Sequence, residues 1–332
     1  MMQDRGNTLD WGVLDIDARR EVERISLELR ERTAEVLHRR GAVVAISGGV
    51  DSAVCATLAV RALRPERVLA LILPEHDSSP ASSLRARVLA AHLGVTPLEQ
   101  DIGPTLTAIG CYRSRDEAVR RILPDYGPDW RMKIVVSGGL EGRINHFRLI
   151  AQSPDGAHHD ARLPLREYLQ IVAATSFKQR VRKTIEYFHA DRLNYAVIGT
   201  PNRLEYDQGF FVRNGDGAAD IKPIAHLYKS QVYAIAEYLQ LPTDIATAPP
   251  TTDTYSLSQG QEEFYFALPY RQMDLALWAL NHGISSERLA ETLGMSSERA
   301  VHVYDDIRAK RRATRYLHQR AVLLGPVPEV GG

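Results

Sequence analysis

The apolar residues of this chain form short runs that alternate with segments in which they recur at helical spacing. Runs at 43–46, 68–73 and 196–198 are typical of parallel strands buried on both faces, and residues 95–102 supply one more short strand. Strands that alternate with helices predict an α/β fold with a doubly wound, mostly parallel sheet. In such folds the ligand lies at the carboxyl ends of the strands, where Ser47, Pro74 and Asp101 fall.

Helical spacing predicts the elements between the strands. A charged amphipathic helix is expected over 15–40, with its apolar positions at Val22, Ile25, Leu27, Leu29, Val36 and Leu37. Further helices are expected over 50–63, 82–94, 165–193 and 226–241. After the turn-rich residues 248–253, the chain is expected to be helical to about residue 324.

Residues 111–165 interrupt this alternation. They hold prolines, glycines and two β-rich pieces at 133–136 and 146–150, which predict an inserted hairpin or small β-containing subdomain. We therefore expect five regions: an N-terminal helical region, the first part of the α/β core, the insertion, the second part of the core and a helical C-terminal region. Their expected ranges are 1–40, 41–110, 111–165, 166–247 and 248–332.

The junction between the first strand and the helix that follows it predicts an anion site. Its sequence is Ser47-Gly48-Gly49-Val50-Asp51-Ser52. Glycines let a ligand approach the backbone, free N–H groups of the first helical turn point at it, and the helix dipole favours negative charge there. A carboxylate suits this place only if a divalent cation lies between it and the anion. The loop therefore predicts a magnesium-bound polyphosphate, although no Walker A sequence occurs in the chain.

Composition narrows the classes of partner. Lys plus Arg equals Asp plus Glu, at 41 each, which argues against a nucleic-acid-coating or membrane-surface role. The two cysteines cannot build a disulfide framework, and no apolar leader or bilayer-spanning run is present. A cytoplasmic protein that binds neither nucleic acid nor membrane is the expectation.

Two further stretches need interpretation. Residues 209–224 combine two aromatics, Gly-Asp-Gly and Asp-Ile-Lys-Pro-Ile, which predicts a binding loop or a tight turn. Residues 285–299 contain two serine caps around a Gly-Met-Ser turn and fit either a helix-turn-helix or a plain helical hairpin. On the 165–193 helix, Lys178 and Arg182 share a face, for which the simplest interpretation is a solvated basic surface.

The Ser-Gly-Gly-x-Asp-Ser loop resembles that of the N-type ATP pyrophosphatases, which cleave ATP into AMP and pyrophosphate. Several further motifs, in one order, resemble the ammonia-dependent NAD synthetases. They are Lys178-Gln179-Arg180-Val181-Arg182, Thr200 with Glu205, Gly209-Phe210-Phe211, Gly215-Asp216-Gly217 with Asp220, Lys229, and Pro250-Thr251-Thr252-Asp253. The resemblance covers most of the chain outside 111–165 and implies an adenine nucleotide alpha hydrolase-like fold.

The resemblance also implies a reaction. The nicotinate carboxylate of deamido-NAD receives AMP from ATP, and ammonia then displaces AMP to give the amide. Ammonia would be free or delivered by a separate glutaminase, and the enzyme would be a homodimer that uses ATP and Mg²⁺.

By the same resemblance, the pyrophosphate cradle would be formed by Ser47, Gly49, Asp51 and Ser52. Gly48 and Val50 of the same loop would also bind the nucleotide. Asp51 and Glu205 would hold magnesium, and Lys229 and Thr251 would contact the phosphates. Arg180 and Thr200 would bind ATP or the acyl-adenylate, with Asp51, Lys229 and Arg180 as the catalytic residues. Lys178, Arg180, Asp216 and Asp220 would serve the second substrate.

Alternatives stay open because the chain departs from the family pattern. Pro201 and Arg203 occupy the Gly-Thr loop, Ala218 replaces a glycine, and 111–165 is long. A paralogue that amidates a different carboxylic acid is one alternative. Another is a nucleotide-sensing regulator with a C-terminal helix-turn-helix, although intact Asp51 and Glu205 argue against it. An RNA-modifying pyrophosphatase is disfavoured by the missing paired cysteines.

Overall fold

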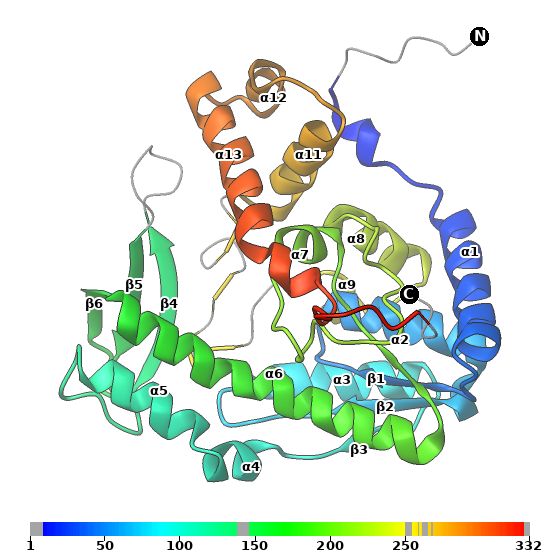
Figure 1. Ribbon diagram of the computed structural model, residues 1–332, viewed down its shortest axis with the longest axis horizontal. Coiled ribbons are helices and arrows are strands. Elements are labelled where there is room, and N and C mark those ends of the chain that lie inside the picture. Colours follow the sequence, from blue (N-terminus) through cyan, green and yellow to red (C-terminus); the bar gives the residue numbers. More distant parts are fainter. Residues whose placement is uncertain are drawn as a thin grey trace.

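The computed structural model describes residues 9–137, 146–249, 254–257, 259–260, 265–266 and 268–328 (Figure 1). Its main sheet has the order β3-β2-β1-β7, and every pair in it is parallel. The strands are β1 (Ala42–Ala45), β2 (Val68–Ile72), β3 (Leu98–Glu99) and β7 (Ala196–Ile198). The predicted α/β fold with a mostly parallel sheet is confirmed.

Helices cover both faces of this sheet because alternate strand residues point to opposite sides. Ala42 and Val44 of β1 belong to a core shared with α1 (Ala18–Glu31), α2 (Val50–Leu63), α3 (Pro80–His92) and α8 (Lys229–Tyr238). Val43 belongs instead to a core shared with α4 (Gly103–Ala108), α5 (Cys111–Arg120) and α6 (Leu165–Leu193).

The N-terminal helix differs from its prediction. It ends at Glu31 and continues as a π-helical turn, η2 (Arg32–Val36). Val22, Ile25 and Leu29 are buried as expected, but Leu27 is 52% exposed and Val36 is 60% exposed. Leu27 lies off the stripe that the other three define, and a π turn rotates the residues after it relative to an α-helix, which turns Val36 outward.

A second, antiparallel sheet lies beside the first half of α6 (Figure 1). It has the order β4-β5-β6, with β4 (Arg131–Ser137), β5 (His146–Gln152) and β6 (His158–Arg162). β4 and β5 are the two β-rich pieces expected to form a hairpin, and β6 adds a third strand. Met132, Ile134 and Leu149 form a core with Ile171 of α6. The inserted segment therefore contains β-structure, as predicted.

The C-terminal region is helical, but the helices described in it begin at Tyr270 and end at His318, so the described residues between 254 and 269 and those after 318 are not helical, contrary to the expectation. α11 (Tyr270–Asn281), α12 (Ser286–Leu293) and α13 (Ser297–Thr314) share a core with η1 (Trp11–Leu14) and with Leu204 of α7 (Arg203–Gln208). Ser285 and Ser296 cap α12 and α13 through their side chains, at the positions that the sequence indicated. The remaining short elements are η3 (Pro65–Arg67), α9 (Thr243–Ala246) and η4 (Arg315–His318).

Within the part of the chain that the structure describes, no helix combines the length and the apolar character that crossing a membrane requires.

Candidate active site

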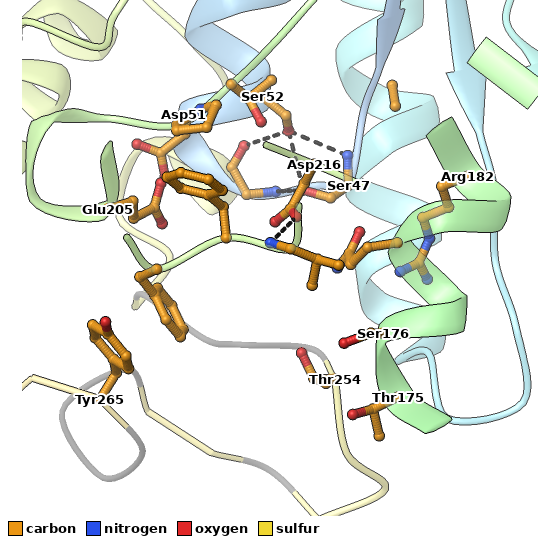
Figure 2. Close-up of a pocket in the computed structure, with 18 of the residues that line it drawn as sticks. Ser47, Asp51, Ser52, Thr175, Ser176, Arg182, Glu205, Asp216, Thr254 and Tyr265 are labelled. Carbon is orange, nitrogen blue, oxygen red and sulfur yellow. Dashed lines mark hydrogen bonds between the residues drawn. The ribbon is translucent and has the colours of Figure 1, made fainter. Parts of the chain in front are cut away.

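A cavity of about 990 Å³ opens at the carboxyl ends of the main strands. The ends of β1, β2 and β7 form its floor, and α6, α7, α8 and α13 contribute side chains to its walls. Figure 2 shows Ser47 and Ser52 at one end, Asp51 and Glu205 together at one side, and Thr175, Ser176 and Arg182 of α6 opposite them. The cavity therefore lies where the fold class predicts a ligand.

The loop after β1 is held in one shape by its own polar groups. The Ser52 hydroxyl accepts from the Ser47 N–H at 3.2 Å and donates to the Gly49 carbonyl at 3.0 Å. Gly48 has φ +80°, and a Cβ there would lie 2.3 Å from the Ser82 carbonyl oxygen in α3. Only glycine fits at Gly48, whereas a Cβ at Gly49 would meet nothing closer than 3.5 Å. The loop thus presents Gly49 and the start of α2 to the cavity.

Asp51 lies at the centre of a charged cluster. Its carboxylate forms an ion pair with the Lys229 Nζ and accepts from the Asn202 amide at 3.1 Å. Asn202 and Glu205 form a capping box at the start of α7, in which the Glu205 carboxylate accepts from the Asn202 N–H at 3.1 Å. The N-termini of α2, α7 and α8 therefore meet around one carboxylate.

Lys229 is the buried cation of this cluster, with its side chain only 3% exposed. Burial opposes its charged form, but the carboxylates of Asp51 and Glu205 outweigh this effect and raise the pKa of Lys229. The side chain is therefore a fixed positive charge between two carboxylates.

Asp51 and Glu205 fit a divalent cation by donor type. Among the described residues no group of three or more His, Cys, Asp or Glu could hold a metal ion. Mg²⁺ in enzymes is commonly held by one or two carboxylates together with substrate phosphates, so two carboxylates beside the glycine loop would be a sufficient protein contribution.

The wall opposite this cluster is built mainly by α6. Its Lys183 pairs with Glu186 at 2.7 Å, and both side chains are buried. Arg182 donates to the Leu73 carbonyl at 3.2 Å. Asp216 faces this wall and accepts from the Val212 N–H at 2.7 Å, while burial raises the pKa of its carboxyl. The acidic and basic groups here are already paired or fixed by the backbone.

Aromatic side chains and α13 close the remaining side. Phe210 stacks on Tyr265 with ring centroids 4.6 Å apart, and Lys310 pairs with Asp306 at 2.6 Å. Lys310 and Thr314 line the cavity from the last turns of α13. One face of this helix is therefore part of the cavity wall.

The cavity brings together most of the predicted site residues. Those that line it are Ser47, Gly49, Val50, Asp51, Ser52, Thr200, Glu205, Asp216 and Lys229. Gly48 packs against α3 beneath the loop. Thr251, with the other residues of 250–253, lies outside the described residues.

Three predicted substrate-binding residues do not line the cavity. Lys178 is 1% exposed and pairs with Glu75 at 3.0 Å and Asp77 at 2.5 Å, so the interpretation of a solvated basic face was wrong for it. Arg180 is exposed and donates to the Arg213 carbonyl at 3.3 Å. The Asp220 carboxylate accepts from the Val197 N–H at 2.7 Å, beside β7.

Sequence reasoning missed the stripe of α6 that faces the cavity and the contribution of α13. The α6 stripe recurs every three or four residues, at Val172, Thr175, Ser176, Gln179, Arg182, Lys183 and Glu186. This spacing was visible in the sequence. Which face of α6 meets the cavity was not, because it depends on contacts with residues far away in the chain.

The fold and the glycine loop place this chain among the nucleotide-binding α/β proteins. The sequence pattern of the NAD synthase family matches residues 21–134 and 155–315. An NH(3)-dependent NAD(+) synthetase of Rhizobium meliloti (strain 1021) is 54% identical over 318 residues, which cover 96% of this chain and 95% of that protein. The chain belongs to the NAD synthase family.

Solved structures show the same fold. An NH3-dependent NAD synthetase from Campylobacter jejuni subsp. jejuni NCTC 11168, in complex with the nitrate ion, is 23% identical with a TM-score of 0.62. The match covers 94% of this chain and all of that one. NMN synthetase from Francisella tularensis is 22% identical with a TM-score of 0.61, over 93% of this chain and 99% of that one.

Proposed function

We propose that this chain is an ATP-dependent amide ligase that adenylates the carboxylate of deamido-NAD, releases pyrophosphate and forms NAD with ammonia. The observation that carries the proposal is the meeting of Asp51, Glu205 and Lys229 beside a phosphate loop at the floor of one cavity. This grouping suits a reaction in which a polyphosphate both binds and departs. Membership of a family with close relatives named for NAD synthesis supports the choice of acceptor.

The chemistry explains why the site needs these charges. A carboxylate is a poor electrophile, so its oxygen first attacks the α-phosphorus of ATP, and the bond to pyrophosphate breaks. Ammonia then attacks the carbonyl carbon, the C–O bond to AMP breaks, and the nitrogen loses a proton. Lys229 offsets the negative charge that develops on the phosphate oxygens. A magnesium ion held by Asp51 and Glu205 would supply further neutralisation at the departing pyrophosphate.

Binding roles follow from position. Ser47, Gly49 and Ser52 cradle the pyrophosphate through hydroxyl and N–H groups at the start of α2, and Val50 and Thr200 line the adjoining floor. Thr251 is proposed as a phosphate contact from its sequence motif alone. Asp216 lines the cavity and is proposed to bind the acceptor.

For Lys178, Arg180 and Asp220 the proposed role is to support the walls. Each forms a hydrogen bond with a cavity residue or a segment next to one. Lys178 donates to the Thr254 carbonyl at 2.8 Å, and Arg180 donates to the Arg213 carbonyl at 3.3 Å. The Asp220 carboxylate accepts from the Val197 N–H of β7 at 2.7 Å. The proposal further includes a homodimer and a cytoplasmic location, with free ammonia or a separate glutaminase as the nitrogen source. The two cysteines, Cys55 and Cys111, are buried and free, which suits a reducing compartment.

One alternative acceptor has structural support. NMN synthetase from Francisella tularensis has the same fold, so the fold by itself does not select the dinucleotide acid. The deciding experiment measures pyrophosphate release by the purified protein with Mg-ATP and ammonium, with deamido-NAD, with nicotinate mononucleotide or with neither. Release that requires deamido-NAD, with NAD identified by mass, supports the proposal. Turnover of the mononucleotide alone, or of neither acid, refutes it.

A further inference from the structure

Asp274 of α11 is completely buried, yet neither of its carboxylate oxygens faces a side-chain cation at ion-pair distance among the described residues. One oxygen accepts from the Lys229 N–H at 3.1 Å, and the other accepts from the Ser230 N–H at 2.7 Å. These are the first two residues of α8. The carboxylate of one helix therefore caps the N-terminus of another helix.

Gln231 of α8 accepts from the Tyr228 N–H at 2.9 Å, which leaves the Lys229 and Ser230 N–H groups to Asp274. The residue before α8 is Tyr228, whose backbone is extended, whereas serine, threonine, aspartate and asparagine are the usual N-cap residues. The first N–H groups of a helix need acceptors, and when they are buried an unpaired one is costly. Asp274, which lies 45 residues after Lys229 in the chain, supplies the acceptors for the N–H groups of Lys229 and Ser230.

The cap fixes the position of the Lys229 backbone. The Lys229 backbone is fixed by Asp274, and its side chain runs from that point to the Asp51 carboxylate. A lysine side chain has a long flexible stem, so the place of its ammonium group depends on a fixed backbone at its base. Burial raises the pKa of the Asp274 carboxyl to about 7, although its hydrogen bonds to the start of α8 act in the opposite direction.

We propose that Asp274 is a positioning residue for the phosphate chemistry: by capping α8 it sets the Lys229 ammonium group against Asp51 and the bound nucleotide. The inference rests on the proposed role of Lys229 as a phosphate contact. It makes α11, and with it the C-terminal helices, part of the ATP site, although Asp274 itself does not line the cavity.

The test compares wild type with Asp274→Asn at pH 8. An asparagine keeps the size but replaces one acceptor by an NH₂ group, which faces a backbone N–H. We expect kcat for pyrophosphate release to fall about 10- to 100-fold, in the range found when a supporting contact of an active site is lost, with KM for deamido-NAD unchanged. Met273→Ala, a buried neighbour in α11, is the matched control for lost stability and keeps its kcat.

A double-mutant cycle separates positioning from general damage. If Asp274 acts through Lys229, then Asp274→Asn has no further effect on kcat in a Lys229→Met background. Additive losses in the cycle, or an equal loss of kcat in Met273→Ala, overturn the inference. If Asp274→Asn does not fold, the Asp274→Glu variant is used, which keeps the charge and displaces it by one methylene. It should lose part of kcat, and full kcat would overturn the inference.

A wrong choice of acceptor can be distinguished from a wrong role for Asp274. Mg-ATP affinity, measured by calorimetry without any acceptor, depends on Lys229 whichever acid is the substrate. Wild type that binds Mg-ATP but makes no NAD refutes the proposed function only. Asp274→Asn that binds Mg-ATP as tightly as wild type, while Lys229→Met binds it more weakly, refutes the positioning role only.

Discussion

The Nζ of Lys229, at the first residue of α8, contacts the carboxylate of Asp51, in the first turn of α2. Two helix N-termini, each with a positive dipole end, thus face one another across a single ion pair. The Asp51 carboxylate offsets the positive charge of the buried lysine and of the two helix ends. A polyphosphate bound with a divalent cation would offer an anion to Lys229 and a cation to Asp51.

Asp51→Asn should abolish pyrophosphate release while the protein stays folded. The amide cannot take the place of a carboxylate as a cation ligand and leaves Lys229 with Glu205 as its nearby negative charge. We expect a loss of at least about 100-fold in kcat, comparable with the loss of one charge-stabilising group in other active sites. Circular dichroism checks the fold, and retained turnover would show that Asp51 does not hold the metal.

Gly48→Ala and Gly49→Ala should separate folding from binding. A Cβ at Gly48 overlaps the Ser82 carbonyl and sits at φ +80°, so this variant should lose about 2 kcal/mol or more of unfolding free energy. Gly49 has φ −91° and open space, so its variant should lose less than about 1 kcal/mol.

The new methyl group of Gly49→Ala would instead lie where the phosphates are proposed to bind. Mg-ATP affinity should therefore fall in this variant although its stability is nearly unchanged. Urea unfolding and calorimetric titration measure the two quantities separately. Unchanged affinity would place the polyphosphate elsewhere in the cavity.

Lys178→Met should destabilise the protein strongly. It leaves the carboxylates of Glu75 and Asp77 buried without their common lysine partner, a change that typically costs about 3–5 kcal/mol. Arg180→Met, two residues away on the exposed side of α6, should change stability by no more than about 0.5 kcal/mol. Equal midpoints of urea unfolding for the two variants would contradict the buried network.

Asp274 should give the protein a pH dependence of stability that Asp274→Asn lacks. The carboxyl has a pKa of about 7 in the folded protein against 3.8 as its ordinary value. Between these values the folded protein holds a proton that the unfolded chain has released, so stability falls as pH rises, by up to about 1.4 kcal/mol per pH unit from this group. Unfolding free energies from pH 4 to 7 test this, because the difference between wild type and variant should change with pH in that direction.

Local signals in the sequence were sufficient to predict the structure of the glycine loop after β1. A buried strand, two glycines and an alanine-rich helix follow one another within a few residues, so their geometry needs no distant contact. The same holds for α6, whose bounds of 165–193 were predicted, and for the caps at Ser285 and Ser296.

The features that the sequence could not predict depend on contacts between residues that are far apart in the chain. Lys178 is buried because Asp77, 101 residues earlier, neutralises it. Asp274 acts on α8 from a different helix, and Lys310 reaches the cavity only because α13 lies against α7. A charged side chain in a helical pattern is usually solvated, so only the tertiary partner distinguishes such residues from a surface.

α6 gives the cavity one wall of fixed length. It runs for 29 residues without glycine or proline, which at the α-helical rise is about 44 Å. Near its start Tyr168 stacks on Phe147 of the small sheet, and near its end Ala190 packs into the core of the main sheet. Because α6 is packed at both ends, the side chains that line the cavity between Val172 and Glu186 keep a fixed spacing along its wall.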